Sequence, residues 1–213
     1  MRELNAMLYL LGPLEQKRVL DVGCGYGRVS EAMLRAGAGE VVGGDPSEGM
    51  LADAEKLTED WDNYSVVTLD AENLPFPDNE FDMVVSMKVL IHFSDPRKAL
   101  AEMARVVKPG GLVVVDVANL LSLNIFTAAS RRFFGKGKVA NYYLTPWEIR
   151  KKYLVPGLPL ERVVGVSMMP FRGLWCRLLG MKLGCTVDLC LGKLPLLKYI
   201  AARCELAFRK EKV

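Results

Sequence analysis

The feature that most constrains the fold of this chain is a glycine-rich turn that follows a short apolar segment. Residues 18–23 read Arg-Val-Leu-Asp-Val-Gly, the kind of apolar run expected for a buried parallel strand. Gly23, Gly25 and Gly27 then stand at alternate positions, where the absence of a Cβ lets the backbone turn tightly and approach a ligand. The next segment, 28–36, is predicted to be a helix closed by a glycine. Strand, turn and helix together predict the first unit of an α/β fold with a ligand site at the turn.

Strand and helix patterns alternate along the rest of the first half. Short apolar runs bounded by turn residues predict strands, and a helical spacing of apolar positions predicts helices. Repeated strand–helix units form a mainly parallel, doubly wound sheet. With no internal repeat or low-complexity segment, the whole chain is expected to be a single domain, 1–213. Strands are expected at 40–45, 64–70, 81–86 and 112–117, and helices at 48–59 and 95–107.

The second half is less regular. A helix is predicted at 145–152, because Thr145 and Glu148 can form a capping box at its start. Two further strands are predicted at 162–168 and 204–209. Lid or substrate-covering insertions are expected at 119–143 and 170–202, the second with short apolar helices at 174–183 and 196–203.

One stretch is apolar enough to suggest a membrane span. Between Lys108 and Arg131 the only charged residue is Asp116, and about 20 apolar residues can cross a bilayer. The stretch opens, however, with a Lys-Pro-Gly-Gly sequence at 108–111 that is expected to be a structural turn, and Asn119 is among the polar residues that interrupt it. A buried strand followed by a lid segment explains this composition better than a transmembrane helix.

Charge is divided unevenly along the chain. Residues 1–118 carry 11 Lys and Arg against 20 Asp and Glu, whereas residues 119–213 carry 17 against 5. Such an asymmetry points to a partner of opposite charge at the basic end, although a solvated dipolar surface would have the same composition.

The cysteines do not predict a metal site. There are five, an odd number without a Cys-x-x-Cys pair, and His92 is the sole histidine. A structural zinc needs about four ligands at short paired spacings, so no metal is expected. The cysteines are interpreted as reduced, small apolar residues, which suits the cytoplasm. Residues 1–16 also lack the pattern of a signal peptide.

An acidic residue strengthens the case for a nucleoside-type ligand. Asp45 ends the second strand, 18 residues after Gly27. At that position a carboxylate can accept hydrogen bonds from both hydroxyls of a ribose. A plain turn residue before Pro46 would look the same in the sequence.

Four motifs carry a resemblance to a known family: VLDVGCGYGRVSEAML, VVGGDPSEGML, LDAENLPFPDNEFDMVVSMKVLIHF and ARVVKPGGLVVVD. In this order and spacing, over roughly residues 18–117, the chain resembles the class I S-adenosylmethionine-dependent methyltransferases. The likeness is greatest to the methyltransferase type 11 group, which is related to the ubiquinone/menaquinone C-methyltransferases. The resemblance implies a Rossmann-like, seven-stranded sheet of order 3-2-1-4-5-7-6, with the last strand antiparallel and helical insertions after strands 5 and 6.

The resemblance also implies how the cofactor S-adenosyl-L-methionine, and its product S-adenosyl-L-homocysteine, would be held. Asp21 and the glycine turn would hold the methionine end, and Asp45 the ribose. Asp70 would accept from the adenine amino group while Met50 packs on the ring, and the carbonyl of Ser86 would face the methionine ammonium. The complete set of expected cofactor contacts is Asp21, Gly23, Cys24, Gly25, Gly27, Asp45, Pro46, Met50, Asp70, Ala71, Glu72 and Ser86.

Transfer of a sulfonium methyl group is an in-line displacement, so the protein mainly aligns the reacting atoms. An acceptor that must lose a proton also needs a base. His92, just beyond the fourth strand, is the candidate catalytic residue, although a packed or loop histidine would fit the sequence equally well. Tyr142, Tyr143, Arg131 and Arg172 lie in the insertions and are candidate substrate contacts.

The insertions combine cations with large apolar groups, a composition that suits a membrane interface. A small or lipid-like acceptor, apolar, anionic or both, is therefore expected, with peripheral membrane contact through the basic half.

RNA or protein methylation is the alternative, since basic charge with aromatic residues can also bind nucleic acid. Against it, residues 86–89 lack the Asn/Asp-Pro-Pro-Tyr motif of amino-directed nucleic-acid enzymes. A cofactor-binding protein without activity is the third reading. A quinone acceptor is not carried over, because only residues 1–17 precede the first strand, whereas quinone-type enzymes carry a helical cover there.

Overall fold

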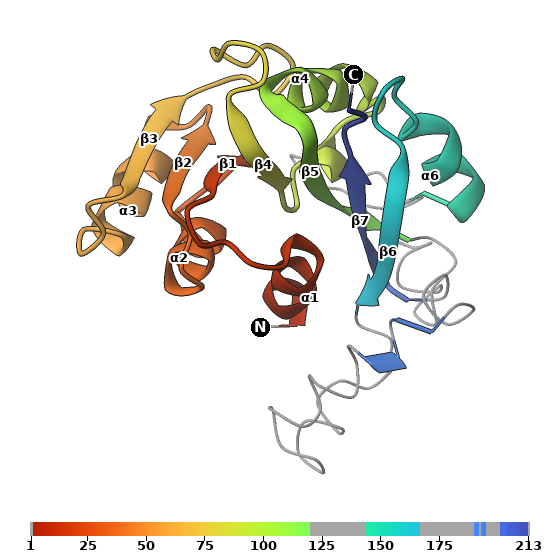
Figure 1. Ribbon diagram of the computed structural model, residues 1–213, viewed down its shortest axis with the longest axis horizontal. Coiled ribbons are helices and arrows are strands. Elements are labelled where there is room, and N and C mark those ends of the chain that lie inside the picture. Colours follow the sequence, from red (N-terminus) through yellow and green to blue (C-terminus); the bar gives the residue numbers. More distant parts are fainter. Residues whose placement is uncertain (1, 120–143, 167–189, 192, 195–200, 213) are drawn as a thin grey trace, which may run out of the picture.

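The computed structural model describes residues 2–119, 144–166, 190–191, 193–194 and 201–212. These residues form one seven-stranded sheet in the order β3-β2-β1-β4-β5-β7-β6, with helices packed on it (Figure 1). Neighbouring strands pair in parallel except at β7, which is antiparallel to both β5 and β6. The expected strand order and antiparallel strand are therefore confirmed. In chain order the elements are α1 (Arg2–Leu11), β1 (Arg18–Val22), α2 (Arg28–Arg35), β2 (Glu40–Asp45), α3 (Glu48–Leu57), β3 (Tyr64–Thr68), β4 (Phe81–Ser86), the 3-10 helix η1 (Leu90–His92), α4 (Arg97–Val106), β5 (Val107–Ala118), α6 (Pro146–Lys152), β6 (Leu160–Val166) and β7 (Arg203–Arg209).

The core lies on both faces of the sheet, because successive side chains of a strand point to opposite sides. On β5, Val113 and Val115 belong to the cluster that includes residues of α4 and α6. Leu112 and Val114 belong to the opposite cluster, which includes residues of α1 and α2. The central strands are buried on both faces, so the loops at the carboxyl edge of the sheet remain as the place for a ligand.

The fifth strand is longer than predicted. Residues 108–111, expected to form a turn, are instead part of β5. Gly110 has a φ of 79°, and the pairing register of β4 with β5 shifts at this point. The bulged segment is held beside the end of β7, because the N–H of Gly110 donates to the carbonyl of Lys210 at 2.9 Å, and the N–H of Lys210 donates to that of Gly111 at 3.0 Å. The predicted change of direction is therefore present as a bulge inside β5, between Val107 and Leu112.

An amino-terminal helix, α1, is the main element that the sequence reading did not predict. Ala6, Met7, Leu10 and Leu11 are all 3% exposed or less and pack against the sheet. Their spacing of three and four residues is the signal that could have found the helix. The region before β1 thus carries a helix that covers part of one face.

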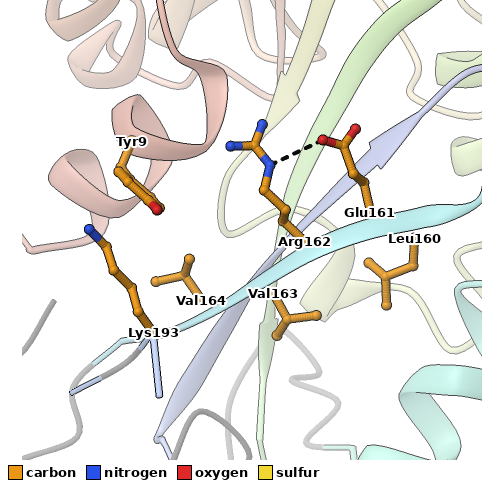
Figure 2. Close-up of a pocket in the computed structure, with 7 residues that line it drawn as sticks. All are labelled: Tyr9, Leu160, Glu161, Arg162, Val163, Val164 and Lys193. Carbon is orange, nitrogen blue, oxygen red and sulfur yellow. Dashed lines mark ion pairs between the residues drawn. The ribbon is translucent and has the colours of Figure 1, made fainter. Parts of the chain in front are cut away.

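Two cations from later in the chain contact α1: Arg162 of β6, and Lys193, which lies outside the sheet (Figure 2). The Arg162 guanidinium donates to the carbonyl of Leu10 at 2.7 Å, near the helix end where carbonyls lack partners within the helix. The Lys193 ammonium lies 3.5 Å from the centre of the Tyr9 ring, a cation–π contact. The residues that line a hollow of about 330 Å³ here include Tyr9, Arg162, Val164 and Lys193. Because both cations already have partners in the protein, we interpret this hollow as the seam that anchors α1.

Several remaining expectations can be compared with the structure. The predicted helix at 145–152 is observed as α6, and its capping box is formed: the N–H of Thr145 donates to the Glu148 carboxylate at 2.7 Å, and the N–H of Glu148 to the Thr145 hydroxyl at 3.3 Å. The predicted helix at 196–203 is wrong at its end, because Arg203 pairs with Ala118 and opens β7. The helix expected at 174–183 and most of both insertions lie outside the described residues. A bilayer-spanning helix needs about 20 apolar residues, and the described part of the chain contains none that qualifies.

Leu10 provides a test of how much α1 contributes to stability. The side chain is completely buried in the cluster between α1 and the sheet. Leu10→Ala should lower the free energy of unfolding in urea by about 2–5 kcal/mol, because it removes apolar contacts and leaves a cavity. Asn5→Ala, at an exposed position of the same helix, should change it by less than about 0.5 kcal/mol. Equal effects of the two substitutions would show that α1 does not pack as described.

Candidate functional site

A cavity of about 600 Å³ lies at the carboxyl ends of β1, β2 and β4. This volume is typical of sites for small molecules. Many of the residues predicted from the sequence line it together. These are Gly23, Cys24, Gly25, Asp45, Pro46, Met50, Asp70, Ala71 and His92.

The glycine turn forms one wall of the cavity. Gly23, Gly25 and Gly27 all have positive φ, at 75°, 55° and 88°, a conformation that L side chains rarely adopt. A Cβ on Gly23 would lie 2.1 Å from Val89, and one on Gly27 would lie 3.1 Å from Ala54, so these two glycines allow close packing behind the wall. A Cβ on Gly25 would meet nothing within 4 Å. Gly25 is therefore the point at which a ligand can come closest to the backbone.

Asp45, at the end of β2, organises the next part of the wall. One carboxylate oxygen accepts from the N–H of Gly25 at 3.0 Å, and the other accepts from the N–H of Ser47 at 2.9 Å. An ionised carboxylate has about four lone-pair positions, so each oxygen retains capacity for a ligand donor. Asp45 can thus shape the glycine turn and still receive two hydroxyl groups.

Asp70, Ala71 and Met50 form the far end of the cavity. The Asp70 carboxylate accepts from the N–H of Glu72 at 2.9 Å, which holds the loop after β3. Met50, on α3, is 45% exposed although it lines the cavity. An apolar side chain beside a carboxylate suits a flat heterocycle that carries an amino group.

Three of the predicted contacts lie behind the cavity or beside it. Asp21 is 1% exposed and accepts a hydrogen bond from the Ser30 hydroxyl at 2.7 Å, while its second oxygen has no partner. Ser86 is fully buried and its hydroxyl donates to the carbonyl of Val22 at 2.9 Å. The Glu72 carboxylate lies 3.8 Å from the Lys98 ammonium. Like Gly27, they are not among the residues that line the cavity, and their direct contact with a cofactor stays a prediction.

Burial also sets the protonation of two groups near the turn. Desolvation raises the pKa of Asp21 to about 7, against the effect of the Ser30 hydrogen bond. Desolvation raises the pKa of the Cys24 thiol well above its usual range, with the Asp21 charge adding to the effect. A nucleophilic cysteine needs a lowered pKa, so this environment favours Cys24 as a small wall residue over a role as a nucleophile.

The other end of the cavity is basic, which the sequence reading missed. Lys88 and Arg28 both line it, and both face Glu3 of α1, whose carboxylate lies 2.8 Å from the Lys88 ammonium and 3.7 Å from the Arg28 guanidinium. Arg28 follows the glycine turn directly, a signal that was available in the sequence. Lys88 and Glu3 meet only in the folded chain. The cavity residues that were not predicted are Tyr26, Arg28, Val29, Leu69, Met87, Lys88, Val89 and Phe93.

His92 stands at this basic end. It is exposed, belongs to η1 and lines the cavity. The candidate substrate contacts Tyr142, Tyr143, Arg131 and Arg172 lie outside the described residues.

Comparison with known proteins agrees with this geometry. A family described as methyltransferase domain matches residues 20–115. An uncharacterized methyltransferase of Schizosaccharomyces pombe is 35% identical over 161 residues, which cover 66% of this chain and 58% of that protein. A ubiquinone biosynthesis O-methyltransferase of Rhizobium johnstonii is 36% identical over 172 residues, which cover 76% of this chain and 68% of that protein. A solved S-adenosylmethionine-dependent methyltransferase from Mesorhizobium loti shares the fold, with a TM-score of 0.73 at 19% identity over 99% of this chain and 98% of that one.

The role of Asp45 can be measured by calorimetry with S-adenosylhomocysteine. A hydrogen bond to a charged group contributes about 1.5–3 kcal/mol, so Asp45→Ala should weaken binding about 10- to 100-fold. Asp53→Asn, an exposed carboxylate on α3, is the control and should leave the affinity unchanged. An unchanged affinity in Asp45→Ala would place the nucleoside elsewhere.

The buried Asp21 should leave a mark on the pH dependence of stability. Its pKa is raised by folding from 3.8 to about 7, so the folded state binds the proton more tightly than the unfolded state does. The contribution of Asp21 to stability is therefore greatest below about pH 4 and declines until about pH 7. Urea unfolding at several pH values should show the stability of Asp21→Asn rising relative to the natural chain over this interval. A difference that does not vary with pH would contradict the assignment.

Proposed function

The chain belongs to the class I S-adenosylmethionine-dependent methyltransferases, and on that premise we propose that it transfers the methyl group of this cofactor to a small or lipid-like acceptor. The observation that carries the proposal is the single cavity in which an open glycine turn, the Asp45 carboxylate and a basic end meet. The acidic end suits the nucleoside, and the basic end faces the acceptor.

The described residues fit the cofactor. Gly25 leaves room beside the backbone for the methionine portion, and Asp45 retains lone pairs for the ribose hydroxyls. Asp70 and Met50 offer an acceptor and an apolar surface for the adenine. Asp21 is buried in β1, two residues before Gly23, and in its ionised form it would bring a negative charge near the cationic methionine end.

When bound, the cofactor supplies a methyl group already activated by its sulfonium. The residues of the chain then have to fix the distance and the line of approach, and such positioning can account for much of the rate. The turn after β4, with Met87, Val89 and Phe93, provides the wall against which an acceptor would be aligned. These mainly apolar side chains would limit the access of water to the reacting groups.

An acceptor that loses a proton needs a base, and we assign that role to His92. It is the histidine of the cavity and stands at the basic end. The imidazole of a histidine can accept a proton from an acceptor group held within hydrogen-bond reach.

The charge of the chain supports an acceptor that is apolar, anionic or both. Lys88 and Arg28 bring two cations to the cavity against the one carboxylate of Glu3, and residues 119–213 carry an excess of basic residues. One relative is named a ubiquinone biosynthesis O-methyltransferase, which is consistent with a small or lipid-like acceptor. Peripheral contact with an anionic membrane through the basic half would bring such an acceptor to the cavity.

The proposal is tested with methyl-labelled S-adenosylmethionine and fractionated cell extract. Label is expected in the lipid or small-molecule fraction, and Asp45→Ala should reduce it at least about tenfold because the cofactor is lost from the site. In the same assay His92→Gln should lower turnover and leave the affinity for S-adenosylhomocysteine unchanged. Label in RNA or protein would favour those acceptors instead. Tight cofactor binding without transfer to any fraction would indicate a protein without methyltransferase activity.

A further inference from the structure

Lys88 has a backbone conformation that demands an explanation. Its φ is 65°, in the left-handed region that L residues other than glycine rarely adopt. Among the non-glycine residues that the structure describes, Gln16 and Asn79 also have positive φ, but neither lines the cavity. A conformation of this kind costs free energy and persists only where neighbouring groups hold it.

The group that holds it is a buried carboxylate on the adjacent strand. Asp116 of β5 accepts a hydrogen bond from the backbone N–H of Lys88 at 2.5 Å. Asp116 is 1% exposed, and its other oxygen forms an ion pair with Arg203 of β7. The carboxylate is therefore fixed from one side by a cation and holds the turn from the other.

The turn at Lys88 sets the position of the segment after β4 relative to the glycine turn, and both segments line the cavity. The next residue, Val89, packs so closely on the glycine turn that a Cβ on Gly23 would lie 2.1 Å from its side chain. Met87, the preceding residue, is buried and also lines the cavity. If Lys88 relaxed to a negative φ, Met87 and Val89 would move relative to Gly23.

We propose that Asp116 is a positioning residue for the cofactor cavity, which acts by holding Lys88 in the left-handed turn that sets Val89 against Gly23. The inference rests on the proposed function, because it assumes that this cavity receives the cofactor. Asp116 itself does not line the cavity. It acts through the backbone of Lys88, whereas Glu3 contacts the side chain of that residue.

The decisive experiment is a rescue. Asp116→Ala should weaken S-adenosylhomocysteine binding about tenfold, because the turn is no longer held. Adding Lys88→Gly should restore the affinity to within about threefold of the natural chain, because glycine adopts a positive φ without help. A purely structural role of Asp116, such as neutralising Arg203, would not be relieved by a change at position 88.

A second pair of variants keeps Asp116 in place. Lys88→Gly and Lys88→Val both remove the ammonium and its ion pair with Glu3. Only valine resists a positive φ. Lys88→Gly should therefore bind S-adenosylhomocysteine within about threefold of the natural chain, and Lys88→Val about tenfold more weakly. This pair gives the answer even if Asp116→Ala does not fold.

Asp82 provides a matched control. Its carboxylate also accepts from one backbone N–H, that of Arg18 at 2.9 Å, and from one cation, Lys108 at 3.0 Å. It lies near the start of β4, at the edge of the sheet opposite the cavity. Asp82→Ala should leave the affinity for S-adenosylhomocysteine unchanged, and Lys88→Gly should restore nothing in that background.

Amide hydrogen exchange, followed by NMR on the protein without cofactor, separates this inference from the proposed function. The amide of residue 88 should be protected in the natural chain and in Asp116→Asn, whose side-chain oxygen can still accept, and should lose protection in Asp116→Ala. Intact protection in a protein that does not bind S-adenosylhomocysteine would refute the proposed function alone. An unprotected amide in the natural chain, or failure of the glycine rescue, would overturn the role of Asp116.

Discussion

The parallel pairing of β1 with both β2 and β4 is the constraint on which the site depends. Because these strands run in the same direction, their carboxyl ends lie at one edge of the sheet, and the loops that follow them converge there. The glycine turn, Asp45 and the turn at Lys88 each begin where one of these strands ends. No single loop contains the site, and the pairing of the strands brings its parts together.

The resulting cavity is electrostatically divided. Asp45 and Asp70 make one end acidic, and Arg28 and Lys88 make the other end basic. The two cations do not stand alone, because Glu3 of α1 lies within 4 Å of both. Through Glu3, α1 therefore partly neutralises the positive charge at the basic end of the cavity.

The sequence predicted those parts of the fold and the site whose cause is local. A glycine that needs positive φ, an aspartate at the end of a strand and a capping box at Thr145 all act over a few residues, and all were found where expected. Two features were not predicted: the inclusion of residues 108–111 in β5, and the end of the helix expected at 196–203. In both places, hydrogen bonds to a distant part of the chain override the local preference for a turn or a helix. The role of Asp116 was hidden for the same reason. Its partners are 28 and 87 residues away, and nothing in the local sequence marks Lys88 for a positive φ.

Because β7 lies between β5 and β6, the sheet beside this site is completed only after β7 has been synthesised. A ribosome completes the strands that bear the glycine turn and Asp45 long before it reaches Arg203. Until then β6 lacks its neighbour in the sheet, and the carboxylate beneath the turn after β4 lacks its counterion. The first half of the chain can collapse early, but Asp116, beneath the turn after β4, gains its counterion only after Arg203, far along the chain, has been synthesised.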